Sequence, residues 1–340
     1  MNLNDVLNRL AARQDLQADE AAAVLEAIIA GQVSEAQIAA FLFGMRAKGE
    51  TVAELAAFVR VMRGAMVRVE VDATGAVDVC GTGGDHSGTF NISTTVAFVV
   101  AGADVPVLKH GNRSISSLSG SADVLEAMGA NAMLDADQAA RVFRETGITF
   151  LFAPLFHPAM KAVGPVRRAL GIRTFFNILG PMLNPAGVTR QVIGAFNRET
   201  AETIAQVLAH FPNEGITTVY AHDGLDELST SANTEVTEVN GPLIHSSYRL
   251  DATEFGLNPP EEGALAGGDA AENARILRDI LDGKGSAAQT DIVAWNAAMA
   301  LRTAGKAADL TEGLDLARES IRSGAARRKL EAFIDASRTA

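Results

Sequence analysis

The sequence CGTGGDHSGTFNISTT, residues 80–95, contains the features that decide the fold. A short apolar run, AVDVC (76–80), precedes it, and an apolar stretch follows it from about residue 95. Strand, glycine-rich loop and helix start in this order predict an anion site, because glycines let the backbone approach a ligand and free N–H groups at a helix start favour negative charge. The alternative is a tight turn that binds nothing, but three glycines followed by Asn-Ile-Ser-Thr favour phosphate binding.

The loop matches neither of the two common phosphate motifs. A Walker loop ends in Gly-Lys-Ser/Thr, whereas Gly84 is followed by Asp85. A dinucleotide fingerprint needs a third glycine where His86 stands. The ligand is therefore predicted to be a phosphorylated small molecule rather than ATP or NAD held in the usual way.

A second polar segment follows the first along the chain. VPVLKH (105–110) predicts a strand that ends at Lys109 and His110. The next residues, GNRSISSLSGSAD (111–123), are rich in hydroxyl groups and contain Arg113. A serine-rich loop is often only a solvated turn, but this one follows the carboxyl end of a predicted strand, where ligands bind in open α/β sheets. We predict a second ligand loop here.

Strands and helices alternate through most of the chain after residue 74. This order predicts an α/β fold with a mainly parallel sheet and helices on both faces. Short strands between 234 and 257 predict an antiparallel addition. The expected strands are 76–80, 105–108, 148–153, 189–196 and 216–221, and the expected helices are 92–102, 120–128, 137–146, 200–211, 269–282, 290–303, 312–322 and 323–337.

Residues 1–66 are helical by apolar periodicity. Asp19 is a possible N-cap and Gly31 a stop, while Ser34 and Thr51 each open a capping box. Further along, residues 157–170 predict a helix that is broken at Gly164-Pro165.

Composition excludes several classes of function. The 340 residues are 48% hydrophobic and 21% charged, which is typical of a globular protein with a sizeable core. A net charge of −12 argues against general nucleic-acid binding. The single cysteine, Cys80, indicates a reducing compartment and a packed thiol rather than a nucleophile. With no signal pattern and no apolar stretch long enough to span a bilayer, the sequence predicts a cytoplasmic protein without membrane contact.

Two charged pairs outside the loops are candidates for chemistry. Asp226 and Glu227 follow an expected strand; adjacent acids in a loop are mostly solvated, but both can turn to one cation. Arg167 and Arg168 follow Gly164-Pro165, and a guanidinium can grip a carboxylate through two parallel hydrogen bonds. One arginine of the pair is expected to be a surface or structural charge.

Four segments together resemble the anthranilate phosphoribosyltransferase family. The resemblance runs in family order and at family spacing from about residue 3 to 335, and it implies transfer of phosphoribosyl from phosphoribosyl pyrophosphate to anthranilate in tryptophan biosynthesis. The segments are CGTGGDHSGTFNIST (80–94), KHGNRSISSLSGSADVLEAMG (109–129), FLFAPLFHPAMKAVGPVRRALGIRTFFNILGPMLNP (150–185) and GLDELS (224–229).

The family also implies an architecture. A small helical domain, 1–70, is joined by about 160–186 and forms a homodimer contact and one wall of the active cleft. A large α/β domain, 74–158 and 187–340, carries the phosphate and metal sites in a nucleoside phosphorylase/phosphoribosyltransferase-like fold.

The family further implies roles for individual residues. Lys109 and Arg167 supply electrostatic stabilisation, and two Mg²⁺ ions per subunit are expected. The metal ligands are Ser93, Asp226 and Glu227, and the anthranilate contacts are Gly81, His110, Asn112, His157 and Arg167. The phosphoribosyl pyrophosphate contacts are Gly81, Gly84, Asp85, Thr89, Asn91, Ile92, Ser93, Thr94, Lys109, His110, Gly111, Asn112, Arg113, Ser114, Ile115, Ser116, Ser117 and Ser121.

Two departures and two alternatives accompany this interpretation. His86 replaces a usual glycine and Leu118 a common basic residue, which predicts altered affinity at most. A nucleoside phosphorylase on the same fold would need a different second loop. A non-catalytic nucleic-acid-binding paralog is expected to lose the acidic pair and show a basic stripe.

Overall fold

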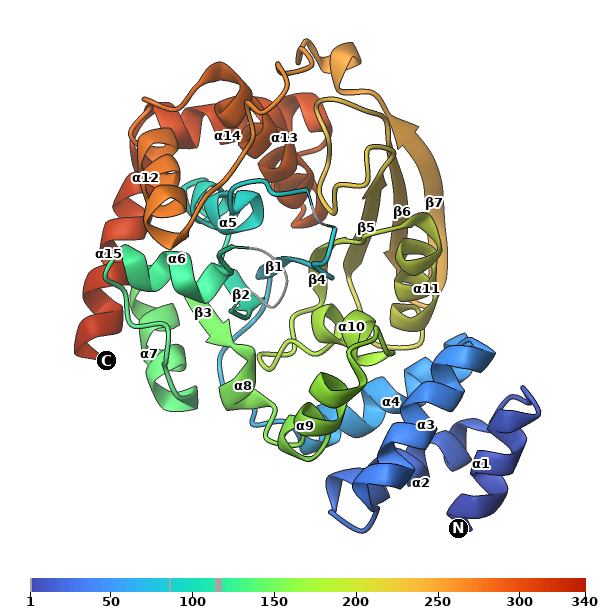
Figure 1. Cartoon of the computed structure of the whole chain (residues 1–340). Helices are drawn as coiled ribbons and strands as arrows, with labels where there is room; N and C mark the ends of the chain where they lie inside the picture. Colours follow the sequence, from blue (N-terminus) through green and yellow to red (C-terminus); the bar gives the residue numbers. More distant parts are fainter. Residues whose placement is uncertain (1, 86, 114–117) are drawn as a thin grey trace.

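The large domain is built on a seven-stranded sheet in the order β3-β2-β1-β4-β5-β6-β7 (Figure 1). The computed structural model describes residues 2–85, 87–113 and 118–340. The first five strands in this order are parallel, and the last two pair antiparallel, so the expected fold class and the antiparallel addition are both confirmed. The strands are β1 Val77–Gly81, β2 Val107–Gly111, β3 Ile148–Phe152, β4 Arg190–Gly194, β5 Gly215–Ala221, β6 Thr234–Asn240 and β7 Leu243–Leu250.

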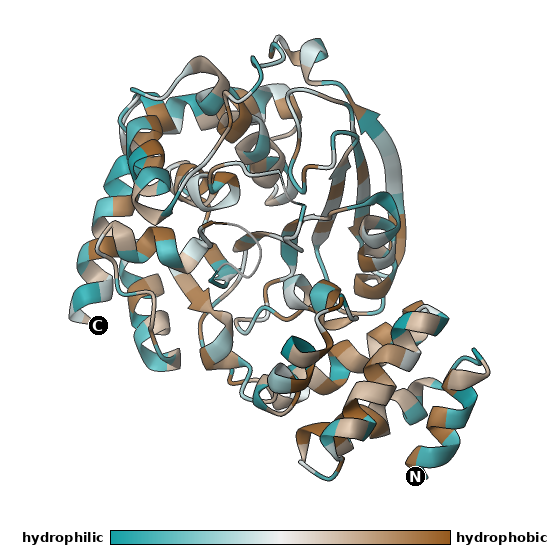
Figure 2. Ribbon diagram, in the orientation of Figure 1, coloured by the Kyte–Doolittle hydropathy of each residue, from teal (hydrophilic) through white to brown (hydrophobic). Residues whose placement is uncertain are grey.

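Helices cover both faces of this sheet. Because successive side chains of a strand point to opposite faces, Val192 and Ile193 of β4 belong to two different cores. Strand interiors are apolar while outer helix faces are polar (Figure 2). The helices of this domain are α5 Ile92–Gly102, α6 Ser121–Ala127, α7 Ala136–Thr146, α11 Arg198–Leu208, α12 Ala270–Leu281, α13 Ala287–Thr303, α14 Leu310–Arg322 and α15 Ala325–Thr339.

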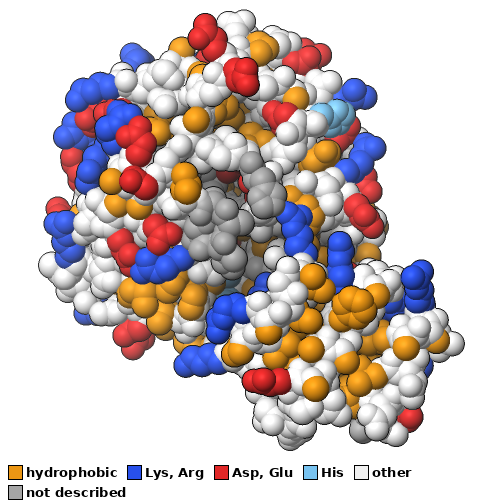
Figure 3. Space-filling model, viewed as in Figure 1, with side chains coloured by type: hydrophobic (Ala, Val, Ile, Leu, Met, Phe, Trp, Pro, Cys, Tyr) orange, Lys and Arg blue, Asp and Glu red, His pale blue; other side chains and the backbone are white. Residues whose placement is uncertain are grey.

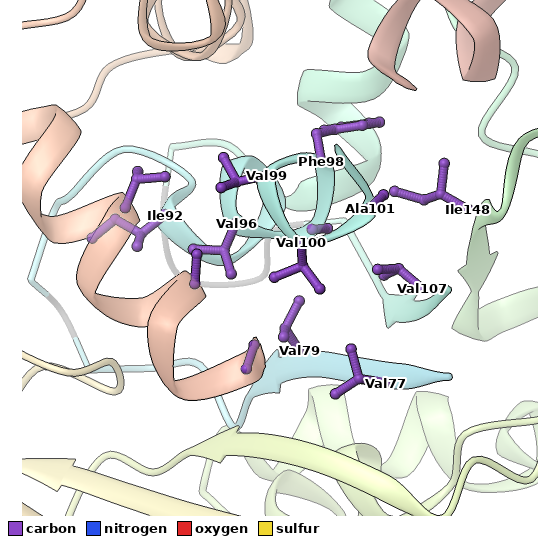
Figure 4. Close-up of a cluster of buried hydrophobic side chains, with 14 of the residues drawn as sticks. Val77, Val79, Ile92, Val96, Phe98, Val99, Val100, Ala101, Val107 and Ile148 are labelled. Atoms are coloured by element: carbon purple, nitrogen blue, oxygen red, sulfur yellow. The ribbon is translucent and has the colours of Figure 1, made fainter. Parts of the chain in front are cut away.

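Helix α5 lies at the centre of the first core. Its residues from Thr94 to Ala101 are all buried, as expected of a helix that is apolar all round. Val96 and Val100 lie next to Val77 and Val79 of β1 (Figure 4). This packing fixes the start of α5 above the carboxyl end of β1, where the glycine loop runs.

The N-terminal residues form four helices, α1 Leu3–Ala11, α2 Ala18–Ile29, α3 Glu35–Lys48 and α4 Val52–Ala65. The capping boxes at Ser34 and Thr51 are confirmed. The N-cap predicted at Asp19 is wrong: Gln17 occupies the cap and Asp19 lies in the first turn of α2. The helix begins earlier because the Glu20 carboxylate accepts a hydrogen bond from the Gln17 N–H at 2.9 Å.

A later segment completes the core of these helices. It consists of α8 Ala153–Phe156, α9 Met160–Leu170, α10 Phe176–Leu179 and the 3₁₀ turn η1 Gly180–Met182; a second 3₁₀ turn, η2 Ala252–Phe255, follows β7. Phe175 stacks on Phe58 of α4 with ring centroids 4.3 Å apart, and Phe41 of α3 meets both rings edge-on. The helical bundle is therefore finished by chain that returns to it from β3.

The predicted break at Gly164-Pro165 is wrong, because α9 runs continuously through Pro165. Proline removes one backbone donor, the one that would reach the Lys161 carbonyl, and its ring crowds the preceding residue. Gly164 has no Cβ to clash with that ring. The turn before Gly164 is already held by hydrogen bonds between residues three apart, such as that from Lys161 N–H to Pro158 C=O at 3.0 Å.

Helices of the described ranges include none that is both long and apolar enough to cross a membrane.

Candidate active site

The glycine loop, Gly81–Asp85, lies at the carboxyl edge of the sheet between β1 and β4. The strand order reverses here: β2 and β3 lie on one side of β1, and β4 and β5 lie on the other. Ligands bind at such a reversal point in open α/β sheets. Thr82 donates its N–H to the Gly194 carbonyl at 2.9 Å, and its hydroxyl accepts the Phe196 N–H at 3.2 Å. Gly83 N–H donates to Asp226 Oδ2 at 2.9 Å.

Asp226 and Glu227 turn inward from the loop that follows β5. The Glu227 carboxylate accepts the Ser93 N–H, from the first turn of α5, at 3.1 Å. Burial, with the nearby charge of Asp85, raises the pKa of Asp226 to about 7. Burial, with the charge of Asp226, raises the pKa of Glu227 to about 8. Two neighbouring carboxylates held in this way have a strong electrostatic demand for a cation.

This donor set fits Mg²⁺. Among the described residues no three His, Cys, Asp or Glu side chains gather as a metal cage. Magnesium is usually bound by one or two carboxylates together with water and substrate phosphates, so a closed protein cage is not required. Two carboxylates beside a hydroxyl and an anion-binding helix start meet that description.

Two glycines allow Asp226 to approach the sheet. A Cβ at Gly194 would lie 1.5 Å from the Asp226 carbonyl oxygen, and a Cβ at Gly81 would lie 2.5 Å from Asp226 Oδ2. Real Cβ contacts are essentially never this short, so any larger residue must displace the acidic loop. These two positions are defined by close packing and not by an unusual φ.

Lys109 brings a positive charge to the same place. Its side chain is almost fully buried, and Nζ donates to the Val79 carbonyl at 2.5 Å and to Ser93 Oγ at 3.3 Å. The neighbouring Thr94 hydroxyl is buried and has no hydrogen-bond partner among the described residues. The start of α5 therefore combines a cation and backbone donors, with the Thr94 hydroxyl enclosed beside them.

Other residues predicted in this region have different surroundings. Asn91 bridges two segments by donating to the Ser119 carbonyl and accepting from Asn273, and the Ile92 side chain is part of the core. Arg113 forms ion pairs with Asp123 at 2.7 Å and Glu126 at 2.6 Å, which compensate its charge. Thr89 bridges to Ala266. Ser114, Ile115, Ser116, Ser117 and His86 lie outside the described residues.

His110, in β2, and His157, which follows α8, meet with their Nε2 atoms 3.2 Å apart. Burial, aided by the proximity of His157, lowers the pKa of His110 to about 3. Burial lowers the pKa of His157 to about 4. Both rings are therefore neutral at pH 7, and His157 Nδ1 has no partner in the described part of the chain.

Arg167 projects from the last turn of α9. Its guanidinium lies 5.3 Å from the centroid of the Phe176 ring and donates to Asn177 Oδ1 at 3.4 Å. Burial lowers its pKa, and it has no acidic partner among the residues that the structure describes. By contrast, Arg168 is exposed. A half-buried arginine without a carboxylate is suited to bind one from a ligand.

The second loop packs closely on the helix that follows it. The Asn112 carbonyl accepts the Ser121 hydroxyl at 3.1 Å, and a Cβ at Gly111 would lie 2.5 Å from that same hydroxyl oxygen. Leu118, where the family commonly has a basic residue, is 81% exposed. Its side chain is therefore available at the surface of this loop.

Sequence reasoning missed a buried polar cluster beneath the site. The Asp78 carboxylate accepts hydrogen bonds from His110 N–H at 3.1 Å, Asn184 Nδ2 at 2.9 Å and Gln191 Nε2 at 3.4 Å. Burial raises the pKa of Asp78 and also that of the neighbouring Cys80, in agreement with a packed thiol. A lone acid inside the apolar run AVDVC was the available signal.

The surface view agrees with these contacts. Figure 3 shows Lys and Arg side chains gathered where the helical bundle meets the large domain, beside a hollow in that face. The protein is acidic overall, so this local basic rim is what an anionic ligand would meet first.

The fold and this site define a class of sugar-transferring enzyme. Residues 73–327 match the α/β domain of a glycosyl transferase family, and residues 4–66 match its helical bundle domain. Anthranilate phosphoribosyltransferases from Salinibacter ruber and a Roseiflexus species are 46% and 47% identical, each over 99% of both chains. The chain therefore belongs to the anthranilate phosphoribosyltransferase family.

Solved structures agree with this assignment. The anthranilate phosphoribosyltransferase of Thermus thermophilus superposes with a TM-score of 0.91 at 38% identity, covering 98% of this chain and 99% of that one. The Saccharomyces cerevisiae enzyme, solved in complex with PRPP and Mg, gives 0.92 at 28% identity, covering 99% and 98%.

Proposed function

We propose that this protein is an Mg²⁺-dependent anthranilate phosphoribosyltransferase of tryptophan biosynthesis. It transfers the phosphoribosyl group of 5-phosphoribosyl-1-pyrophosphate to anthranilate, giving N-(5-phosphoribosyl)anthranilate and pyrophosphate. The observation that carries the proposal is the convergence of the partly buried Asp226–Glu227 pair with the glycine loop, Lys109 and the start of α5. These groups suit a magnesium-bound pyrophosphate better than a simple sugar.

The donor site comprises Gly81–Asp85, Ser93, Lys109, Asp226 and Glu227. Backbone N–H groups and Lys109 bind the negative oxygens, and the oriented start of α5 adds to their attraction. The serine-rich loop from Gly111 to Ser121 is proposed to cover the same ligand.

The carboxylates of Asp226 and Glu227, with the Ser93 hydroxyl, are proposed to hold two Mg²⁺ ions per subunit. When bound, magnesium neutralises the charge that develops on the departing pyrophosphate. The Saccharomyces cerevisiae relative has been solved with both PRPP and Mg, which supports this use of the carboxylates.

The acceptor site comprises His110, Asn112, His157 and Arg167, with Gly81 on its donor side. Arg167 is proposed to bind the anthranilate carboxylate, and no acid among the described residues competes for it. The two neutral histidines provide polar, uncharged contacts beside the amine. Neutral surroundings suit an amine that attacks as a free base.

Reaction at C1 of the ribose breaks the bond to the pyrophosphate oxygen, which leaves with the electron pair. The ribose passes through an oxocarbenium-like state, the anthranilate nitrogen forms the new bond to C1, and the nitrogen then loses a proton. The aromatic amine is neutral at pH 7 and needs no strong base. Positioning and charge stabilisation supply most of the rate.

The decisive experiment follows the loss of anthranilate fluorescence with phosphoribosyl pyrophosphate and Mg²⁺. Turnover that disappears with EDTA and returns with Mg²⁺ is the expected result. Phosphorolysis of thymidine or uridine without anthranilate turnover would instead establish the nucleoside phosphorylase. Binding to nucleic acid without either activity would establish the non-catalytic paralog.

We further propose a cytoplasmic homodimer whose contact is the helical bundle, with domain limits of 1–70 plus 160–186 and 74–158 plus 187–340. Phe43 on α3 is 59% exposed, which is unusual for a large aromatic residue and supports a covered face. Light scattering at micromolar concentration should give twice the chain mass of 35.6 kDa. A mass near that of one chain would contradict the dimer.

A further inference from the structure

Arg173 connects the glycine loop to the segment that returns from the helical bundle. It lies after α9, outside the elements that carry the proposed donor and acceptor contacts. Its Nη2 donates to the Gly84 carbonyl at 2.5 Å, and its guanidinium carbon lies 4.1 Å from the centroid of the Phe196 ring. The Arg173 side chain is therefore held in place both by stacking on Phe196 and by its hydrogen bond to Gly84.

Phe196 holds a second point of the same loop. Its N–H donates to the Thr82 hydroxyl, so one residue carries the platform for Arg173 and a bond to the loop. With the Asp226 contact to Gly83, three consecutive loop residues are each fixed by a different segment. Gly84 has φ +73°, a backbone conformation that favours glycine, and in this conformation its carbonyl accepts the arginine.

The segment that carries Arg173 also contacts Arg167. Asn177 Oδ1 accepts the Thr174 N–H at 3.0 Å and the Arg167 Nη2 at 3.4 Å. A continuous set of contacts therefore runs from Gly84 through Arg173 and Thr174 to Asn177 and Arg167. These contacts join the loop of the proposed donor site to an arginine of the proposed acceptor site.

We propose that Arg173 is a positioning residue that fixes the glycine loop for the phosphoribosyl donor and couples that loop, through Asn177, to Arg167 at the acceptor site. This rests on the proposed function. Arg173 acts through the Gly84 carbonyl and the Phe196 ring, not as a charge on the ligand. Binding of the two substrates is then linked, and the linkage is reciprocal.

The first test measures binding of inorganic pyrophosphate with Mg²⁺ by calorimetry. Loss of a hydrogen bond from a charged donor predicts an affinity about 10- to 100-fold weaker in Arg173→Met. Arg168→Met is the matched control on the exposed neighbouring arginine and should stay within about twofold. Thermal melting of each variant verifies that it is folded.

A double-mutant cycle separates positioning from direct charge. Phe196→Leu should weaken pyrophosphate binding by itself, and combining it with Arg173→Met should add nothing, because both changes release the same loop. Arg173→Lys should also lose affinity, since an ammonium cannot reproduce the stacked planar contact. Full retention in Arg173→Lys, or strictly additive losses, would overturn the positioning role.

The coupling is measured with anthranilate fluorescence in the presence and absence of pyrophosphate and Mg²⁺. Pyrophosphate should change the anthranilate dissociation constant in the wild type, and Arg173→Met or Asn177→Ala should abolish that change. If the anthranilate dissociation constant of the wild type is the same with and without pyrophosphate, the proposed coupling is refuted. These titrations need no turnover, so a wild type that binds both ligands without reacting would refute the proposed function and not this inference.

Discussion

The proposed donor site and the proposed acceptor site are constructed differently. The proposed donor site is built at strand ends from glycines, backbone N–H groups, the buried Lys109 and the partly buried Asp226 and Glu227, and its parts contact each other directly. The acceptor site depends on a few side chains, His110, His157 and Arg167, of which the arginine belongs to a segment that lies against the helical bundle.

This difference separates two properties of the enzyme. On this proposal, donor binding depends mainly on the backbone, because the glycine loop and the acidic pair directly follow strand ends and contact each other. Acceptor binding is determined by individual side chains, which can be exchanged with little change in the backbone. The predictions below test this separation, from the largest expected effect to the smallest.

Neutralising the acidic pair should have the largest effect. Asp226→Asn with Glu227→Gln removes two formal charges from the cation site, and loss of several kcal/mol of charge stabilisation predicts a fall in kcat/KM of roughly 10³-fold. A magnesium titration of initial rates measures it. Glu261→Gln with Glu262→Gln is the control, an exposed adjacent acidic pair with the same change in charge. Unchanged turnover in the first variant would remove the metal assignment.

Gly194→Ala should damage the donor site through packing alone. The new Cβ would lie 1.5 Å from the Asp226 carbonyl oxygen, so the acidic loop must shift. A misplacement of about 1 Å can cost about 10²-fold in rate. Gly180→Ala is the control, because a Cβ there meets nothing within 4 Å. Equal donor kinetics in both variants would show that the donor site tolerates backbone movement, contrary to the comparison.

Arg167→Ala should affect mainly the acceptor. Losing a charge-assisted hydrogen-bonded contact costs about 1.5–3 kcal/mol, or roughly 10- to 150-fold in apparent anthranilate affinity. Donor affinity should move far less, and Arg168→Ala should change neither. Separate titrations of phosphoribosyl pyrophosphate and of anthranilate against each variant measure the two affinities. Equal loss of donor and acceptor would make Arg167 structural, and loss in Arg168→Ala alone would identify the other arginine.

Counted per pH unit, the smallest effect is the loss of stability at acid pH. The folded protein holds the pKa values of His110 and His157 at about 3 and about 4, below the ordinary 6.5, so the unfolded chain binds more protons between pH 6.5 and 4. Stability should therefore fall as pH falls through this window, by at most about 1.4 kcal/mol per pH unit for each histidine.

Urea unfolding of the wild type and of His157→Asn at several pH values measures this pH dependence of the free energy of unfolding. The difference between the two proteins should shrink on acidification, because the variant lacks one of the protonation sites. His245→Asn, at an exposed position of β7, should show no such trend. A pH-independent difference for His157→Asn would contradict the burial of a neutral ring pair.

Much of the fold was predictable from the sequence. The apolar stretch after the glycine loop predicted α5 with its observed limits, and the alternation of strands and helices predicted the parallel sheet. The error at Gly164-Pro165 has a local cause, since one missing donor in the middle of a packed helix costs less than the burial of Val163 and Val166 returns. The apolar pattern of the sequence does not show that tertiary packing offsets the missing hydrogen bond.

The site was predictable only in part. Residue types and motifs indicated the glycine loop, Lys109 and the acidic pair, all of which the structure brings together. The roles of Gly194 and Arg173 depend on distances between segments far apart in sequence. No local sequence pattern shows that a Cβ at Gly194 would clash with the Asp226 carbonyl. Nor does one show that Arg173 hydrogen-bonds to Gly84, 89 residues earlier in the chain.

The return of residues 159–183 to the helical bundle has a consequence for how the protein is made. The first four helices leave the ribosome well before Val163 and Phe175, the side chains that cover their apolar faces. At typical synthesis rates of about 5–20 residues per second, the gap lasts roughly 5 to 20 seconds. During that time the nascent chain presents Phe41 and Phe58 without their partners, and a binding site for cellular chaperones is open.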